Sequence, residues 1–374
     1  MKIATILGTR PEIIRLSRVM SALDRYADHV IVHTGQNYDY ELNQIFFDDL
    51  EIRKPDYFLE AAGKNAAETI GLVISRVDTA LAEIQPEAVL ILGDTNSCLA
   101  AISAKRRKIP VFHMEAGNRC FDERVPEEIN RKIVDHISDI NMPYSSISRE
   151  YLLREGLAPD RVIKTGSPMY EVLHYYLPKI TASQVMARLD LQEKGYFLIS
   201  SHREENIDFP DQFEKLIGML RGLVEQFGKR VIVSAHPRTR NKINELGVKL
   251  PEEVELLKPL SFSEYVNLEL HAIATLSDSG TITEESSILN FPALNIRNAH
   301  ERPEGMEEGA VMMTGLDFGR VMDGLKILEL QGSGAERTLR MVNDYYVPNV
   351  SEKVARVIVS HVDFVNRFVW RKNL

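Results

Sequence analysis

Short runs of apolar residues recur along the chain and alternate with amphipathic stretches. Continuous apolar runs of this length are typical of parallel strands that are buried on both faces. A first set of such runs lies at 2–8, 29–35, 87–94, 109–116 and 161–166. After a helical stretch near 170–190, a second set lies at 195–201, 230–236, 273–280 and 292–297. The pattern predicts two doubly wound α/β domains in tandem, joined by a short segment around 167–190.

Helical patterns are clearest at three places. A helix is expected to open near Pro11, and another near Pro126, because proline suits the first helical turn. In the second of these we expect a buried stripe formed by Ile129, Ile133, Ile137 and Ile140. The last segment, 351–373, has helical spacing of its apolar residues. Ser351 is its expected N-cap, and Arg371 and Lys372 suit its last turn.

Composition narrows the classes of protein. The chain has 374 residues, 44% of them hydrophobic, so it can bury two cores. Its formal net charge of −9 and the lack of a long basic run make nucleic acid an improbable partner. The two cysteines, Cys98 and Cys120, imply no disulfide framework. No apolar stretch reaches the roughly 18 residues of a membrane span, and the N-terminus is typical of a strand, not a signal peptide. We therefore expect a soluble cytoplasmic protein without a membrane partner.

Polar residues at the strand ends are the places where chemistry is expected, because open parallel sheets bind ligands beyond the carboxyl ends of their strands. Gly8 ends the first strand, and the helix that follows offers free backbone N–H groups to an anion. Arg10 and Arg15 add positive charge there. The alternative is an ordinary strand–helix turn with solvated arginines.

Acidic residues gather in the first half. Asp94 and Glu115 each end a strand, and the alternative role for Asp94 is an N-cap. Glu127 and Arg131 share a helix face, which in isolation would be an exposed ion pair worth little. If that face lies over the strand ends, the carboxylates form a group suited to general acid–base chemistry.

The second half of the chain contains a different set of candidate ligand-binding residues. His202 and Arg203 follow the strand at 195–201, although a lone histidine is more often structural. The loop of Ser279, Gly280 and Thr281 leads into a helix, and its small residues and free amides fit a diphosphate. Glu284 or Glu285, in the first turn, could hold ribose hydroxyls. Neither a Gly-x-Gly-x-x-Gly fingerprint nor a Walker loop occurs, and zinc spacing and a nucleophile elbow are also missing.

An ordered set of motifs then becomes specific: GTRPE, TGQ, GDT, HMEAG.R, PEE.NR, HREEN, DSG...EE and RPE. In this order they resemble the non-hydrolysing UDP-N-acetylglucosamine 2-epimerase family over about residues 1 to 370. The resemblance implies a glycosyltransferase B-like fold, with two Rossmann-like domains facing a cleft. The first domain is expected at 1–168, with the C-terminal helix 351–374 packing back on it, and the UDP-binding domain at 190–350.

The resemblance also implies an activity and roles for residues. Members invert carbon 2 of a UDP-2-acetamido sugar by eliminating UDP and adding it back, which needs no cofactor and no metal; a homodimer is expected. The implied acid–base carboxylates are Asp94, Glu115 and Glu127, with Arg131 orienting them and His202 beside the leaving diphosphate. The implied contacts to substrate are Arg10, Arg15, Arg203, Ser279, Gly280, Thr281, Glu285 at the ribose, Arg302, and Tyr265 on the uracil. The alternative for Tyr265 is a tyrosine in the core.

Several motifs depart from the common pattern of the family. A lysine is replaced by Arg15, a second glycine by Thr281, an arginine by Glu204 and a histidine by Asn37. The variants HREEN, NYDYELN and GNRCFDERVPEEINRKIVDH are most similar to the capsule and O-antigen branch. That branch converts UDP-2-acetamido-2,6-dideoxy-L-talose to UDP-N-acetyl-L-fucosamine.

Three alternatives remain open from sequence. The substrate could be UDP-N-acetylglucosamine itself, giving UDP-N-acetylmannosamine. The chain could be a sugar-nucleotide transferase of the same fold, which would need an acceptor. It could also be a non-catalytic UDP-sugar sensor, although a sensor does not require three acidic groups beside the sugar. A hydrolysing relative would release free sugar irreversibly.

Overall fold

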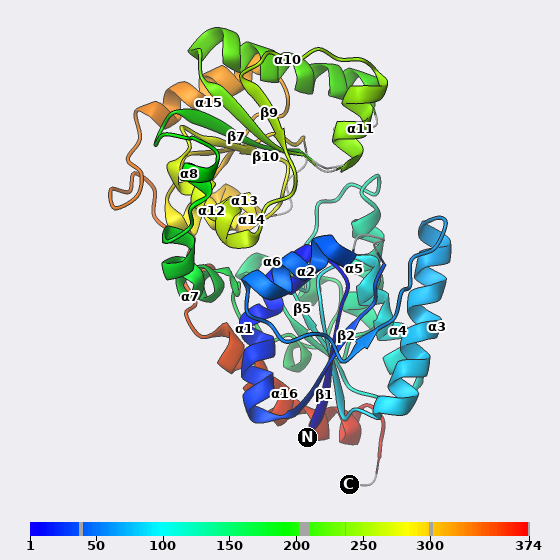
Figure 1. Cartoon of the computed structure of the whole chain (residues 1–374). Coiled ribbons are helices and arrows are strands. Elements are labelled where there is room, and N and C mark those ends of the chain that lie inside the picture. The colour runs from blue at the N-terminus through cyan, green and yellow to red at the C-terminus, as the bar shows by residue number, and fades with distance from the viewer. Residues whose placement is uncertain (37–39, 202–208, 236, 299–301, 373–374) are drawn as a thin grey trace. The chain divides into compact units, whose positions relative to one another are not determined.

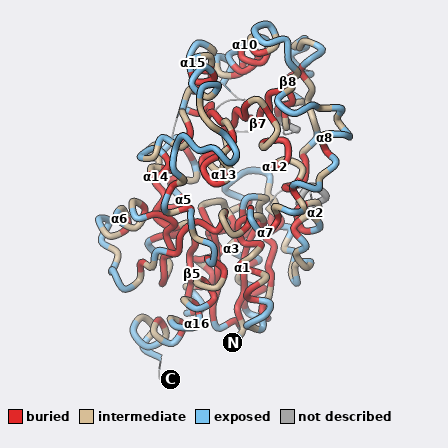
Figure 2. Tube along the Cα trace, turned by 90° about the vertical axis from the view of Figure 1, so that its left-hand side faces the viewer, coloured by how far each residue is buried: buried red, intermediate tan, exposed pale blue. Residues whose placement is uncertain are grey.

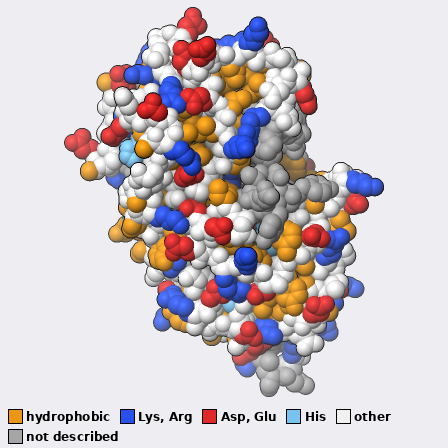
Figure 3. Space-filling view, viewed as in Figure 1, with side chains coloured by type: hydrophobic (Ala, Val, Ile, Leu, Met, Phe, Trp, Pro, Cys, Tyr) orange, Lys and Arg blue, Asp and Glu red, His pale blue; other side chains and the backbone are white. Residues whose placement is uncertain are grey.

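The chain folds into two compact units, which are shown in a computed structural model that describes residues 1–36, 40–201, 209–235, 237–298 and 302–372 (Figure 1). Unit 1 comprises Met1–His174 and Asp344–Leu374, and unit 2 comprises Tyr175–Asn343. The chain therefore enters unit 2 within helix α7 (Met169–Thr181) and returns to unit 1 ahead of α16 (Val350–Phe368). Acidic and basic side chains are interspersed over the visible face of each unit (Figure 3).

Unit 1 is built on a parallel sheet. Its described strands number six, in the order β3-β2-β1-β4-β5-β6. They are β1 (Lys2–Leu7), β2 (Asp28–His33), β3 (Tyr57–Phe58), β4 (Ala88–Leu92), β5 (Val111–Met114) and β6 (Ile140–Met142). The helical elements are α1 (Arg10–Tyr26), α2 (Tyr40–Asp49), α3 (Ala66–Ile84), η1 (Asn96–Leu99), α4 (Ala100–Arg106), α5 (Pro126–Ile137), α6 (Ser146–Arg154), η2 (Pro159–Arg161), the start of α7 up to His174, and α16.

Helices cover both faces of this sheet. On one face, α3 and α4 pack apolar side chains such as Val73, Val77 and Ala101 against β1, β4 and β5. On the other face α1 lies beside α16, as Figure 1 shows. The strands are consequently buried on both sides, and they form the red centre of the unit in Figure 2. This explains why the strands read as continuous apolar runs.

Unit 2 repeats the same plan. Its described strands number six and are parallel, in the order β12-β11-β10-β7-β8-β9. They are β7 (Tyr196–Ser201), β8 (Arg230–Ala235), β9 (Val254–Leu257), β10 (Thr275–Ser277), β11 (Ala293–Asn295) and β12 (Met312–Met313). The helices are α8 (Val185–Arg188), α10 (Pro210–Phe227), α11 (Pro237–Glu245), α12 (Phe262–His271), α13 (Ile282–Leu289), α14 (Pro303–Glu307) and α15 (Phe318–Glu329). An apolar core joins α10 and α15 to one face of the sheet, and a smaller cluster joins α8 and α12 to the other.

Local sequence explains where several helices begin. Asn65 accepts a hydrogen bond from the backbone of Glu68 at 2.9 Å and caps α3. Ser261 and Glu264 form a reciprocal capping box at the start of α12. Asp317 accepts from the backbone of Arg320 at 3.0 Å and caps α15. Each such cap stabilises its helix by about 1 kcal/mol, because it satisfies an N–H group that has no partner within the helix.

Most predicted strands are confirmed, and two features of the strand prediction are wrong. The run 161–166 forms no strand: Val162 makes one isolated bridge to Asn141. The sixth strand of unit 1 is instead β6, whose first residue Ile140 was assigned to a helical stripe. A run of three residues directly after a helix carries too little periodicity to be distinguished from the helix.

The caps predicted for the C-terminal helix are also wrong. Helix α16 begins at Val350 with Asn349 as its N-cap, and it ends at Phe368, before Arg371 and Lys372. Ser351 lies inside the first turn and is buried. Its backbone N–H donates to the Glu171 carboxylate of α7 at 2.8 Å. Ser351 is therefore held by a residue of another helix, and it does not cap α16.

The buried stripe predicted for α5 is the largest correction. Ile129 is 52% exposed and Ile133 is 39% exposed, whereas Glu128, Arg131 and Asp135 are buried. The helix is amphipathic with its polar side turned inward. Burying charged groups is costly unless each finds a partner, so this orientation points to ion pairs beneath the helix.

Gly117, just after β5, provides a test of this packing. Its φ is +81°, and a Cβ atom there would lie 2.4 Å from the Ser148 carbonyl oxygen. We expect Gly117→Ala to destabilise the protein by at least about 3 kcal/mol, since backbone strain and overpacking add. Gly156 is the matched control, because its φ is +91° but no atom lies within 4 Å of the added Cβ. Gly156→Ala should cost about 1 kcal/mol. Equal losses in urea unfolding would contradict the role of the contact with Ser148.

Candidate active site

The polar residues predicted from sequence follow strands at or near the point in each sheet where the order of the strands reverses. In unit 1 this point lies between β1 and β4, and in unit 2 between β7 and β10. Loops at such switch points leave a crevice at the carboxyl ends of the strands, where ligands bind in this class of fold.

In unit 1, Glu12 joins the two loops at the switch point. Its carboxylate accepts hydrogen bonds from the backbone N–H groups of Gly8 at 2.8 Å and Thr9 at 2.7 Å, in the loop after β1. It also accepts from the hydroxyl of Thr95 at 3.0 Å and from the hydroxyl of Ser97, in the loop after β4. Burial raises the pKa of Glu12, although the hydroxyl and amide donors act in the opposite direction. Sequence analysis missed this residue, although Thr9 and Glu12 have capping-box spacing.

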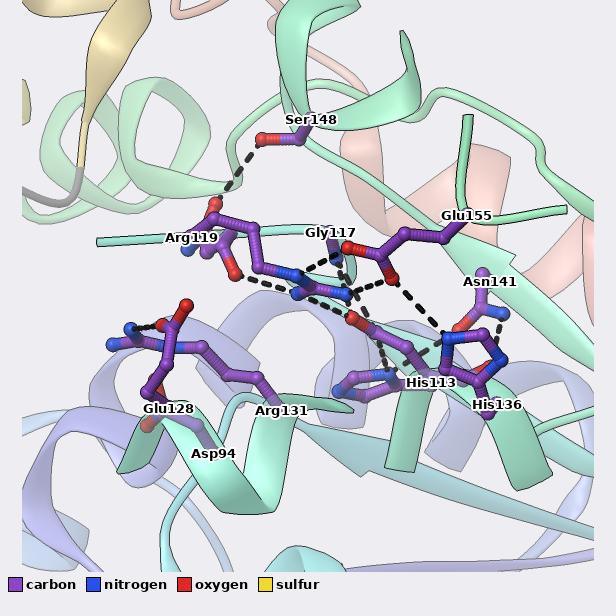
Figure 4. A network of polar contacts seen from close by, with 12 residues as sticks. Asp94, His113, Gly117, Arg119, Glu128, Arg131, His136, Asn141, Ser148 and Glu155 are labelled. Carbon is purple, nitrogen blue, oxygen red and sulfur yellow. Dashed lines mark hydrogen bonds and ion pairs between the residues drawn. The ribbon is translucent and has the colours of Figure 1, made fainter. Parts of the chain in front are cut away.

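Asp94 is held by helix α5, as Figure 4 shows. Arg131 Nε donates to the Asp94 carboxylate at 2.7 Å, and Arg131 Nη1 donates to Glu128 at 2.8 Å. The amide of Asn130 donates to the Asp94 carbonyl oxygen at 2.8 Å. Asp94 is not the N-cap of the next element, a position that Thr95 takes. The face of α5 that bears Asn130 and Arg131 thus contacts the end of β4, as the functional interpretation of this helix required.

Glu115 lies at the end of the neighbouring strand. Its backbone is left-handed, with φ +63°. Arg15 of α1 lies 3.2 Å from its carboxylate, and the amide of Asn118 donates to the other oxygen at 3.2 Å. The Arg15 guanidinium also lies 5.7 Å from the centre of the Tyr144 ring. Arg15, predicted as a substrate contact, therefore contacts one of the predicted catalytic carboxylates.

The remaining candidates of unit 1 lie nearby on the same elements. Glu127 is half-buried in the first turn of α5. Arg10 is partly exposed in the first turn of α1, with its guanidinium 5.6 Å from the Phe46 ring. The structure thus forms two ion pairs at the ends of neighbouring strands, Asp94 with Arg131 after β4 and Glu115 with Arg15 after β5.

In unit 2, the loop after β10 has the predicted form. The Ser277 hydroxyl accepts from the backbone N–H of Ser279 at 3.1 Å, and the hydroxyls of Ser279 and Thr281 lie 2.9 Å apart. Helix α13 begins at Ile282, directly after this loop. Its N-terminus therefore presents backbone N–H groups beside Gly280, an arrangement that suits an anion.

The acidic first turn of α13 is buried. Glu284 pairs with Arg302 at 3.4 Å, and both side chains are almost fully buried. Glu285 is 6% exposed. Tyr265 on α12 is half-buried and packs against the apolar cluster that includes Leu268. Arg302, predicted as a substrate contact, is thus placed at the acidic end of α13.

Glu269 of α12 was missed by sequence analysis and is fully buried. Neither of its carboxylate oxygens has a hydrogen-bond partner among the described residues. Burial, with a further contribution from the charge of Glu285, raises the pKa of Glu269 well above its usual value. Burial therefore favours the neutral acid form of Glu269 over its carboxylate.

His202 and Arg203, together with Glu204 and Asn37, lie outside the described residues. Among the residues that the structure describes, no group of three or more His, Cys, Asp or Glu side chains is arranged to hold a metal ion. None of the described helices is long and apolar enough to cross a membrane.

The fold and the strand-end chemistry define the class first: this is a two-unit α/β enzyme with glycosyltransferase B-like architecture. Residues 21–359 match the sequence profile described as UDP-N-acetylglucosamine 2-epimerase, and the chain belongs to this family.

Relatives of known structure cover the whole chain. The structure of UDP-N-acetylglucosamine 2-epimerase from Rickettsia bellii shares 52% identity and a TM-score of 0.92, over 100% of both chains. The Methanocaldococcus jannaschii UDP-GlcNAc 2-epimerase, in complex with UDP-GlcNAc and UDP, shares 31% identity and a TM-score of 0.89, over 96% of this chain and 100% of its own. A UDP-2,3-diacetamido-2,3-dideoxy-D-glucuronate 2-epimerase from Pseudomonas aeruginosa is 33% identical, over 84% of this chain and 88% of its own. The chain is thus an isomerase that acts on a UDP-sugar.

Glu269 generates a prediction about stability. Because its pKa is raised in the folded protein, the Glu269 side chain ionises in the unfolded chain above about pH 4.3 but keeps its proton to higher pH in the folded protein, so rising pH favours unfolding. Glu269→Gln mimics the neutral acid. We expect the free energy of unfolding of this variant to exceed that of the wild type by an amount that grows by up to about 1.4 kcal/mol for each pH unit above about pH 4.3.

The measurement is the midpoint of urea unfolding at several pH values between mildly acidic and mildly basic. Glu252→Gln serves as the control, because Glu252 is exposed on the same unit and its substitution should give no such pH dependence. A stability difference for Glu269→Gln that does not change with pH would show that Glu269 is ionised in the folded protein.

Proposed function

We propose that the enzyme inverts carbon 2 of a UDP-2-acetamido sugar by elimination and re-addition of UDP. A base removes the proton from carbon 2 as the bond from carbon 1 to the UDP oxygen breaks, which leaves a 2-acetamidoglycal and UDP. UDP then adds back at carbon 1 while an acid delivers a proton to the opposite face of carbon 2. The proton and the UDP removed in the first half are both replaced in the second, so no redox cofactor is required.

The observation that carries this proposal is the pair of carboxylates at adjacent strand ends. Asp94 follows β4 and Glu115 follows β5, and each carboxylate is held by a guanidinium group, from Arg131 and Arg15 respectively. Fixed carboxylates of this kind suit proton removal and delivery on two faces of one ring. We assign Glu127, on the exposed edge of α5, to the same chemistry, with Arg131 orienting Asp94.

We assign the nucleotide to unit 2. The amides around Ser279, Gly280 and Thr281 would receive the diphosphate, and Glu285 would bind the ribose. Tyr265 would pack on the uracil, and Arg302 would orient the acidic turn through Glu284. By family resemblance, Arg10, His202 and Arg203 would add charge at the diphosphate. Preorganised donors of this kind stabilise a departing anion by several kcal/mol in other enzymes.

The substrate that we propose is UDP-2-acetamido-2,6-dideoxy-L-talose, with UDP-N-acetyl-L-fucosamine as the product, in capsule or O-antigen precursor synthesis. The support is the set of variant motifs, among them GNRCFDERVPEEINRKIVDH at 117–136. The Pseudomonas aeruginosa relative acts on a UDP-sugar with a different pattern of substituents, so the family accepts variation away from carbon 2. The second candidate is UDP-N-acetylglucosamine, the sugar named for most of the relatives. A homodimer and a cytoplasmic location stay predictions from the sequence.

The substrate proposal is tested by solvent exchange. Incubation with each of the two UDP-sugars in deuterated water should replace the proton at carbon 2, and proton NMR measures this loss. We expect rapid exchange and epimerisation with the 2,6-dideoxy-L-talose derivative and much slower turnover of UDP-N-acetylglucosamine. The reverse preference would exclude the first substrate, and exchange with neither would exclude the proposed reaction.

The roles of the carboxylates are tested by isosteric substitution. Asp94→Asn, Glu115→Gln and Glu127→Gln should each lower kcat by at least about 100-fold, the contribution of one acid–base group, while the affinity for UDP is retained. Glu83→Gln, at an exposed position of α3, should leave kcat unchanged. Full activity in all three site variants, with UDP bound normally, would remove the chemical basis of the proposal.

A further inference from the structure

His113 is a buried histidine on β5 for which the proposed reaction gives no role. It lies two residues before Glu115 and is 1% exposed. Its neighbours are Asp135 of α5, Asn141 of β6 and Gly93 after β4. Figure 4 shows His113 beside Asn141. The hydrogen-bond partners of a buried histidine determine whether its ring is neutral or protonated.

Both ring nitrogens of His113 face hydrogen-bond acceptors. Nε2 lies 2.8 Å from the Gly93 carbonyl oxygen. Nδ1 lies 3.1 Å from the Asp135 carboxylate and 3.3 Å from Asn141 Oδ1. The orientation of the Asn141 amide is consistent with this, because its Nδ2 donates to the Asp135 carbonyl oxygen at 2.8 Å. A neutral imidazole carries one N–H group, so it would leave one nitrogen facing an acceptor without a hydrogen.

The charges around His113 support a protonated ring. Asp135 also accepts from Arg119 Nη1 at 2.7 Å and from the backbone N–H of Gly117 at 3.2 Å. Arg119 in turn forms a two-pronged ion pair with Glu155, with distances of 2.8 and 2.6 Å. Two cations, His113 and Arg119, thus alternate with two carboxylates, Asp135 and Glu155. Without the charge on His113, this buried cluster would carry an unbalanced carboxylate, which is costly.

Two further titratable groups lie close to this cluster. His136 Nε2 lies 3.2 Å from Glu155 at the exposed end. On the η1 side, burial and the nearby carboxylates raise the pKa of the Cys98 thiol, which therefore stays neutral and adds no charge. For His113 itself, burial alone would lower the pKa, but Asp135 and the Gly93 carbonyl outweigh it, and the pKa of His113 is raised.

The hydrogen bond to Gly93 connects this imidazole to Asp94, one of the proposed acid–base carboxylates. Gly93 directly precedes Asp94 and has a left-handed backbone, with φ +74°. Its N–H donates to the Met114 carbonyl oxygen at 3.0 Å, and its carbonyl accepts from His113. Asn130 then holds the Asp94 carbonyl, and Arg131 holds the Asp94 carboxylate. The peptide groups on both sides of the Asp94 Cα are thus each fixed by a hydrogen bond.

We propose that His113 is an imidazolium at neutral pH and that it positions Asp94 through the Gly93 carbonyl. This inference rests on the function proposed above, and it makes His113 a positioning residue for that reaction. A charge-assisted hydrogen bond is stronger than a neutral one, so the imidazolium fixes this turn more firmly than a neutral ring. A displacement of about 1 Å in a reacting group can cost 100-fold in rate.

The protonation state is tested without activity. In protein labelled with ¹⁵N-histidine, the ring nitrogen shifts distinguish the imidazolium from the neutral ring, and His113→Gln assigns the signal. We expect His113 to be doubly protonated at neutral pH in the wild type and to become neutral in Asp135→Asn. The internal control is His33 of β2, since burial lowers the pKa of His33 to about 4 and its Nδ1 accepts from the Gly35 N–H at 3.0 Å. A neutral His113 in the wild type would overturn the inference.

The positioning role is tested by kinetics with the UDP-sugar. His113→Gln keeps an N–H donor for Gly93 but lacks the charge, and Asp135→Asn keeps the imidazole but removes the anion that charges it. Both should lower kcat by at least about tenfold, with KM and the affinity for UDP unchanged. The control is His361→Gln on α16, where the imidazole bonds within its own helix to the Val357 carbonyl and kcat should be unaffected.

The pH dependence separates positioning from general loss of stability. Because the folded pKa of His113 is raised above its unfolded value, its contribution is complete below about pH 6.5 and is lost as pH rises through the folded pKa. The wild type should lose kcat in that alkaline range, and His113→Gln should not show this step. Losses of kcat that follow the loss of thermal stability, with an unchanged pH profile, would show a structural role alone. A wild type without solvent exchange contradicts the proposed function, whereas a neutral His113 contradicts this inference alone.

Discussion

The need to pair buried charges determines how helix α5 lies in the structure, and much of the proposed site depends on that helix. Glu128, Arg131 and Asp135 are all buried on its inner face, and the contacts of each include a partner of opposite charge. Breaking such a pair by removing one partner typically costs several kcal/mol, because it leaves an uncompensated charge out of water. The orientation of the helix is therefore specified by ion pairs, even though this leaves Ile129 and Ile133 exposed.

The same helix supplies contacts to two strand ends. Through Asn130 and Arg131 it fixes Asp94 after β4, and through Asp135 it fixes the Gly117 backbone and His113 of β5. The parallel sheet brings the ends of adjacent strands together, and α5 then determines the position of the side chains that they carry. Glu12 has a comparable role on the other side of the switch point, where it joins the loops after β1 and β4.

The sheets could be predicted from sequence because their strands are buried on both faces and read as continuous apolar runs, as in 2–8 and 87–94. Strand β6 was not predicted, since its three residues closely follow helix α5 and carry too little periodicity to be distinguished from it. The candidate residues Asp94, Glu115 and Arg131 could be found because they follow strands or share a helix face with a nearby acid. Partners distant in sequence could not: Glu12 and Ser97 are separated by 85 positions.

The protonation states of two histidines could not be predicted from sequence either. His33 and His113 both lie on strands of one sheet and are both buried. The first faces the Gly35 N–H, and burial lowers its pKa; the second faces Asp135, and its pKa is raised. Nothing in the residues next to His113 indicates this difference, because its decisive neighbour, Asp135, comes from helix α5. Protonation state is a property of the tertiary arrangement, and it follows only once the strand order is known.

Glu115 offers an argument about function that does not depend on relatives. A left-handed backbone at a residue other than glycine costs of order 1 kcal/mol or more. If the end of β5 required only a turn, glycine would provide it at lower cost, as Gly93 does at the end of β4. The glutamate is instead retained in the strained conformation, and Arg15 and Asn118 hold its carboxylate in place. The strained backbone and these two contacts together fix the Glu115 carboxylate, as the proton transfer proposed for it requires.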